Sequence, residues 1–131
     1  MHLYALTIRF ALSLLSLLAA CSVVDEMTPR LYVGLLTAHA APLRFEIAKA
    51  LLANPGKPVP QAGALPLPPP VGLAPMKFDF GWVTTGGAIV VQSSKYAVML
   101  VQEPVVTSSG VKWTCVVTPA DAKPSGCGDE R

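Results

Sequence analysis

The stretch Val111-Lys112-Trp113-Thr114-Cys115-Val116-Val117, followed after a short loop by Pro124-Ser125-Gly126-Cys127, decides how the C-terminal half of this chain folds. Every second side chain from Val111 to Val117 is apolar, which is the period of a β-strand with one buried face. Cys115 lies on that strand and Cys127 lies beside the C-terminus, so the two cysteines predict a disulfide-closed terminal loop. Because disulfides persist in oxidising compartments, this loop predicts that the chain is exported.

The sequence upstream of this strand predicts three further strands of an antiparallel meander. Residues 76–83 alternate in polarity, Ala88 to Gln92 forms a second strand, and Tyr96 to Val101 is a nearly continuous apolar run of the kind found in central strands. Turn-forming stretches separate these runs; they are Thr84-Thr85-Gly86-Gly87, Ser93-Ser94-Lys95 and Ser108-Ser109-Gly110. We therefore expect residues 76–131 to form an antiparallel sheet of about four strands with the disulfide loop at its end.

Three aromatic residues share one face of the first of these strands. Phe78, Phe80 and Trp82 are separated by single residues, which places their rings on the same side. Such a row can serve as a platform for a sugar or a peptide. The spacing is also that of a sheet face buried on a helix, and we expect these rings to belong to the core.

Residues 21–54 carry the pattern of an amphipathic helix. Thr28 can cap the helix, Pro29 suits its first position, and Asn54-Pro55-Gly56 ends it. Pro42 clashes with the carbonyl four residues earlier, so the stretch forms either one kinked helix or two short helices that meet at Ala41-Pro42. The apolar stripe consists of Leu31, Leu35, Leu36, Ala40, Leu43, Ile47, Ala50 and Leu51.

The helical and sheet segments are joined by a proline-rich stretch. Residues 55–75 contain eight prolines, including the run 68–70, and we expect an extended, partly polyproline loop without a packed element. A ligand for a proline-reading groove is the alternative. Because the strands can bury their apolar face only against the helix, the chain predicts an α+β fold: one N-terminal helix packed on a roughly four-stranded antiparallel sheet, with a C-terminal disulfide loop.

The N-terminus predicts export and attachment to a membrane. Residues 1–20 combine a weakly basic start with an apolar run of signal-peptide length. They end in Leu18-Ala19-Ala20-Cys21, which resembles the lipobox of bacterial lipoproteins and implies lipidation of Cys21 after cleavage. An uncleaved membrane helix over residues 3–24 is the alternative, since about 20 residues span a bilayer. Ser22 after the cysteine favours the outer membrane.

Composition and motifs argue against nucleic-acid binding and catalysis. Ten basic and eight acidic residues give a net charge of +2, and no clustered Lys/Arg patch marks a nucleic-acid footprint. The sequence has no Gly-x-Ser-x-Gly elbow, phosphate loop or Cys-x-x-Cys pair. His39, the only histidine after residue 20, has apolar helix neighbours and is expected to be structural. A reactive thiol at Cys115 or Cys127, activated by Lys112 or Lys123, is the alternative to the disulfide. We expect no enzyme activity, metal or cofactor.

The combination of helix, variable loop, antiparallel sheet and terminal disulfide loop resembles the type IV pilin family. The motif Trp113-Thr114-Cys115 followed by Pro124-Ser125-Gly126-Cys127 is similar to the Trp-x-Cys … Pro-x-x-Cys ending of Gram-negative pilins. The resemblance implies a pilin-like αβ-roll over one domain, residues 21–131, and a role in pilus structure or adhesion at the outer membrane or cell surface. It also implies an interaction surface on the terminal loop, with Asp121, Lys123 and Pro124. The implied partners are pilin subunits, pilus assembly components or a second copy of the chain.

The N-terminal segment departs from the pilin pattern. Pilins have a short leader ending in Gly and then Phe-Thr-Leu-Ile-Glu, whereas the first glycine here is Gly34 and no such segment exists. Asp25 and Glu26 lie beyond the apolar run, not near its start. An outer-membrane or periplasm-facing lipoprotein that acts as a pilus accessory or binding module is therefore the alternative to a filament subunit. A small exported enzyme is the third class.

Overall fold

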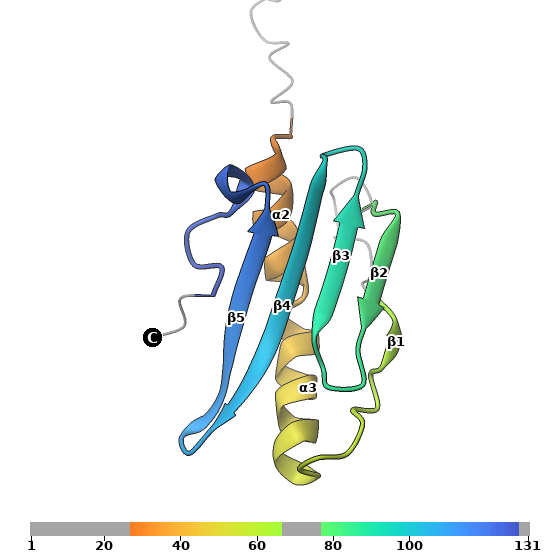
Figure 1. Ribbon diagram of the computed structural model, residues 1–131, viewed down its shortest axis with the longest axis vertical. Coiled ribbons are helices and arrows are strands. Elements are labelled where there is room, and N and C mark those ends of the chain that lie inside the picture. The colour runs from red at the N-terminus through yellow and green to blue at the C-terminus, as the bar shows by residue number, and fades with distance from the viewer. Residues whose placement is uncertain (1–26, 67–76, 129–131) are drawn as a thin grey trace, which may run out of the picture.

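The computed structural model describes residues 27–66 and 77–128 (Figure 1). It contains two α-helices, a short 3-10 helix and one five-stranded antiparallel sheet in the order β1-β2-β3-β4-β5. The elements are α2 (Pro29–His39), α3 (Ala41–Ala53), β1 (Gly63–Ala64), β2 (Phe80–Val83), β3 (Ile89–Ser93), β4 (Val98–Thr107), β5 (Gly110–Thr118) and η1 (Ala120–Ala122). The α+β class is confirmed, and the sheet has one strand, β1, that the sequence did not predict.

The helical stretch is divided into two helices, as one of the two sequence alternatives required. The Thr28 side chain accepts a hydrogen bond from the Leu31 amide, so α2 begins with the predicted cap. Ala40 ends α2 and precedes α3, whose first turn contains Pro42. Proline fits a first turn because it has no amide hydrogen to donate.

Both helices lie on the same face of the sheet, and the core fills the space between the two layers (Figure 1). Alternate residues of β3, β5 and the first half of β4 point toward the helices. The period of two was predicted for β5, whereas the nearly continuous apolar run at Tyr96 to Val101 did not indicate which side chains face the core. The buried apolar side chains of this core include Tyr32, Val33, Leu36 and Ile47 from the helices and Val83, Ile89, Val91, Leu100, Trp113 and Val117 from the sheet.

A glycine at the turn between β2 and β3 lets the sheet approach α3. Gly87 has a φ of 88°, a region that non-glycine residues rarely adopt. A Cβ atom at this position would lie 2.6 Å from Ile47 Cγ2. The Gly86-Gly87 turn therefore lies directly on α3, where a larger residue would push helix and sheet apart.

The prediction that the aromatic row belongs to the core is wrong for two of its three rings. Phe80 is 47% exposed and Trp82 is 45% exposed, on the face of the sheet that points away from the helices. The inward positions of β2 are instead Gly81 and Val83. A Cβ on Gly81 would lie 2.5 Å from the ring of Phe78, so this ring folds over the glycine and fills the inner side of the strand.

The proline-rich stretch is also more ordered than expected, because β1 lies within it. Gly63 pairs with Val83 and Ala64 with Trp82 at the edge of the sheet. The side chains of Val59 and Leu65 are buried. Unlike the prolines around them, both residues have an amide hydrogen. The Val59 amide donates to the Thr85 carbonyl and the Leu65 amide to the Gly81 carbonyl, each at 3.0 Å. The part of this stretch from residue 67 to 75 lies outside the described residues, as do residues 1–20 and Cys21.

Candidate interaction surface at the disulfide loop

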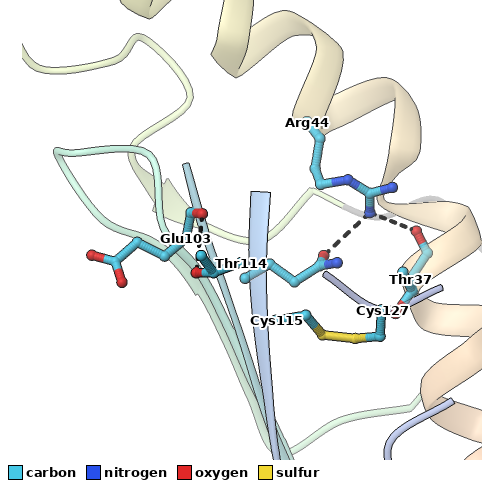
Figure 2. The surroundings of a disulfide bond; sticks show 7 residues. Thr37, Arg44, Glu103, Thr114, Cys115 and Cys127 are labelled. Carbon is cyan, nitrogen blue, oxygen red and sulfur yellow. Dashed lines mark hydrogen bonds between the residues drawn. A yellow bond between two sulfur atoms is a disulfide. The ribbon is translucent and has the colours of Figure 1, made fainter. Parts of the chain in front are cut away.

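The predicted disulfide is present and joins the end of β5 to the C-terminal loop (Figure 2). The Cα atoms of Cys115 and Cys127 are 5.4 Å apart, within the usual range for a disulfide. Cys115 is 6% exposed and Cys127 is 1% exposed. Neither sulfur is therefore presented as a reactive surface thiol, and the pair connects the sheet to the loop from the inside.

The chain between the two cysteines is compact and closes against β5. After β5 it passes through η1, and the amide of Cys127 donates to the Pro124 carbonyl at 3.4 Å. Gly128 then lies against the backbone of Cys115, where an added Cβ would be 2.7 Å from the Cys115 nitrogen. Gly128 also has a φ of 87°, so only glycine satisfies both the conformation and the close approach.

The loop and the beginning of α2 form one continuous surface. The Arg30 Nε donates to the backbone carbonyl of Asp121 at 3.1 Å, and the ring of Pro124 lies beside Gly34. A shallow cavity of about 260 Å³ separates the first turn of α2 from η1; it is lined by Thr28, Pro29, Arg30, Pro119, Asp121 and Ala122. The terminal loop is thereby fixed to the end of the helix that leads back toward the N-terminus.

The three residues predicted for this surface have different surroundings. The side chains of Asp121 and Lys123 are exposed, whereas Pro124 is half-buried against α2. The structure thus presents two opposite charges on the loop, with Asp121 beside Arg30, and it places Pro124 against Gly34 of α2.

A polar link that the sequence reading missed lies beneath the sheet near the disulfide (Figure 2). The Arg44 guanidinium donates to the Thr37 carbonyl at 2.8 Å and to Gln102 Oε1 at 3.3 Å. Thr37 belongs to the last turn of α2, whose carbonyls lack intrahelical partners, and a cation there is favoured by the helix dipole. Gln102 is only 2% exposed. Arg44 therefore ties the end of α2 to β4 and satisfies a buried amide oxygen.

The surroundings of two titratable side chains, Tyr32 and Asp79, shift their pKa values. Burial raises the pKa of the Tyr32 phenol, whose hydroxyl donates to the Lys77 carbonyl at 2.7 Å. The side chain and backbone amide of Ser94 hydrogen-bond the Asp79 carboxylate and lower its pKa. Tyr32 also lies close to Ser93 and to Asp79, and its ring stacks on that of Tyr96 with the centroids 4.3 Å apart. These groups join the start of α2 to the end of β3 and the turn that follows it.

The described residues offer little basis for metal chemistry. Within residues 27–66 and 77–128, no group of three or more His, Cys, Asp or Glu side chains is placed to hold a metal ion. His39 lies in the last turn of α2 and is half-buried. Over the same ranges, no helix is both long enough and apolar enough to cross a membrane. No family model matches the sequence, and no curated protein or solved structure matches it either.

Proposed function

We propose that this chain is an exported, membrane-anchored, non-enzymatic protein with a structural or adhesive role in a type IV pilus or a related system. The observation that carries the proposal is the buried Cys115–Cys127 disulfide at the end of a helix-on-sheet domain. A thiol pair of this kind stays oxidised outside the cytosol.

The arrangement of the terminal loop supports a role in protein–protein contact. The loop presents Asp121 and Lys123 to solvent and is held rigid by the disulfide and by the Arg30 contact. A preorganised loop loses little conformational entropy when it binds. In the pilin family, which the terminal motif resembles, the corresponding loop takes part in subunit contacts, and we assign the same role to this one.

A second candidate is an outer-membrane lipoprotein that acts as a pilus accessory and never enters a filament. It is favoured by Leu18-Ala19-Ala20-Cys21, which resembles a lipobox. The break between α2 and α3 also favours it, because a pilin is expected to have one continuous helix through this region. The two candidates share the exported domain and differ in the N-terminal attachment.

Intact mass of the native protein, extracted from membranes with and without reductant, tests the attachment. A chain that begins at Cys21 with added acyl mass supports the accessory role, and an unacylated chain that keeps the N-terminal apolar segment supports the filament subunit. Either species should gain about two hydrogens on reduction. A chain that is neither acylated nor membrane-bound would refute the anchored protein altogether.

Sheared surface filaments test the partner. The filament subunit should be present in them, and the accessory should remain with the membrane but bind pilus components. Charge reversal by Lys123→Glu should weaken either association several-fold, whereas Lys49→Glu on the exposed side of α3 serves as the control. Equal association of both variants would remove the terminal loop from the proposed interface.

A further inference from the structure

The face of the sheet opposite the helices is apolar and is covered by no element that the structure describes (Figure 1). We call it the outer sheet face. Three of its side chains, Phe80, Trp82 and Met99, are between 43% and 47% exposed, and Val116 is 61% exposed. The uncovered face of an antiparallel sheet is usually polar. A contiguous apolar patch on such a face usually marks an interaction site.

The register of the strands arranges this face in two rows that cross the sheet. In the first row Trp82 pairs with Val90, Val90 with Val101, and Val101 with Val116. This row is apolar across all four strands. The second row consists of Phe80, Gln92, Met99 and Thr118. Neither of these two rows contains a charge, whereas the next row of the same face carries Glu103 opposite Thr114 and so limits the apolar area to the two rows. The surface that complements the two rows must itself be largely apolar.

The two aromatic rings give the face an asymmetric shape. The rings of Phe80 and Trp82 lie 6.4 Å apart at an angle of 11°, so they form one bulky ridge on β2. The other edge, on β5, carries the small side chains of Val116 and Thr118. The face is thick at β2, beside the two-residue edge strand β1, and thin at β5. A partner that fits it must have the opposite slope.

We propose that the partner is a second copy of this chain, packed sheet to sheet about a two-fold axis that runs parallel to the strands. Such an axis keeps each residue at its own height and exchanges the two edges, so β2 of one copy covers β5 of the other. The ridge at Trp82 then lies over Val116 of the second copy, and Val90 lies over Val101. Each row meets itself, and the thick edge meets the thin one.

The position of the chain entry selects this axis, and this step rests on the proposed membrane anchor. The N-terminal end of α2 lies at one end of the long axis, along which the strands also run (Figure 1). Five residues, 22–26, separate Cys21 from Met27, and the six Cα–Cα steps between them reach at most about 20 Å. An axis parallel to the strands keeps both entry points at the same end, as two chains in one membrane require. An axis perpendicular to the strands would put them at opposite ends.

The size of the face predicts a weak association that the membrane strengthens. Four strands about 4.8 Å apart, over the roughly four residues of about 3.3 Å each that the two rows span, give a flat area of about 250 Å² before side-chain relief is added. Specific interfaces take about 600–1,000 Å² from each partner. The dimer should therefore dissociate in the micromolar range in dilute detergent, whereas two-dimensional confinement raises the effective concentration.

Complementary charge substitutions on the full chain test the pairing. Val90→Lys alone and Val101→Asp alone each bury an unpaired charge in the homodimer and should weaken it at least tenfold in sedimentation experiments. In a mixture of the two variants, the new lysine faces the new aspartate of the other copy, and dimers should return. Leu52→Lys, at an exposed position of α3, is the matched control, and unchanged melting temperatures would show that the variants fold.

Several outcomes would overturn the proposal. One is a wild-type chain that stays monomeric up to about 100 µM in detergent and gives no cross-link in membranes. Another is a monomer whose Trp82 fluorescence resists quenchers, because the chain's own residues would then cover the face. A third is a mixture of the two variants that remains monomeric. If the chain is not anchored to a membrane but still dimerises with this charge pattern, the proposed anchor is refuted and the proposed dimer through the outer sheet face stands.

Discussion

Removal of the Cys115–Cys127 disulfide should destabilise the domain by an amount that follows from the loop it closes. The two cysteines are separated by 12 positions. The loop-entropy relation then gives about 9.5 cal/mol/K, or about 3 kcal/mol at 25 °C. Small domains are stable by about 5–15 kcal/mol in total, so this is a substantial fraction. Since 1 kcal/mol shifts the melting temperature of such a domain by about 4–8 °C, we expect a loss of about 12–24 °C.

The assay compares urea unfolding of the oxidised wild-type chain, the reduced wild-type chain and the double variant Cys115→Ala/Cys127→Ala. Reduction and double substitution should lower the free energy of unfolding by similar amounts, because both release the same loop. Ser108→Ala is the control, since Ser108 is exposed in the turn between β4 and β5 and does not take part in the pair. Its unfolding midpoint should match that of the wild type within about 0.5 kcal/mol.

The reasoning fails if the oxidised and reduced chains unfold at the same urea concentration. That result would mean that the packing of η1 and Gly128 on the rest of the domain holds the loop equally well without the covalent link. A double variant that is much less stable than the reduced chain would have a different meaning. It would show that the buried side chains of the cysteines contribute more through packing than through the bond.

Three further changes test the core and the loop. Tyr32 has a raised pKa in the folded state, so its contribution to stability is complete below the ordinary value of about 10 and is lost as pH rises through the folded pKa; Tyr32→Phe should flatten this alkaline decline in pH-dependent urea unfolding. Gly128→Ala should lower the free energy of unfolding by about 2–4 kcal/mol in the same assay, because the new Cβ meets the Cys115 backbone. Gly126→Ala is the control: Gly126 has a similar φ but open space around it, so the substitution should lower the free energy of unfolding by only about 1–2 kcal/mol. Ile47→Ala should lower the free energy of unfolding by about 2–5 kcal/mol, because the side chain is fully buried between α3 and the sheet; a loss below 1 kcal/mol would contradict the described packing.

Local patterns were sufficient to predict the ends of the helical stretch and the disulfide. Thr28 and Pro29 determine a helix start through one hydrogen bond and one fixed dihedral, and Cys115 and Cys127 each lie where the chain can bring them together. The division at Ala40 was open, because the preference for one kinked helix or two helices depends on what satisfies the freed carbonyls. In the structure that partner is the Arg44 guanidinium of α3, which donates a hydrogen bond to the Thr37 carbonyl near the end of α2.

The proline-rich stretch was mispredicted because proline density was taken as a property of the whole segment. Packing depends on individual residues, and Val59 and Leu65 each keep one amide that the edge of the sheet can use. Neither the burial of these side chains nor the pairing of β1 with β2 has a local signature. Both require the position of the sheet edge, which is fixed only when the whole sheet has formed.

The aromatic row shows why strand polarity alone could not assign the faces of the sheet. The alternation in β2 defines two faces of the strand. Gly81 has no side chain to fill the inner face, whereas Phe80 and Trp82 give the outer face the large apolar side chains that are typical of a core. The structure reverses this assignment, since Phe78 lies outside the strand and its ring fills the place above Gly81. The two large rings then have no helix to cover them. Phe80 and Trp82 are exposed because Gly81 leaves room for the Phe78 ring on the inner side of the strand. The apolar face that results is the outer sheet face, on which we propose that a second copy of the chain packs.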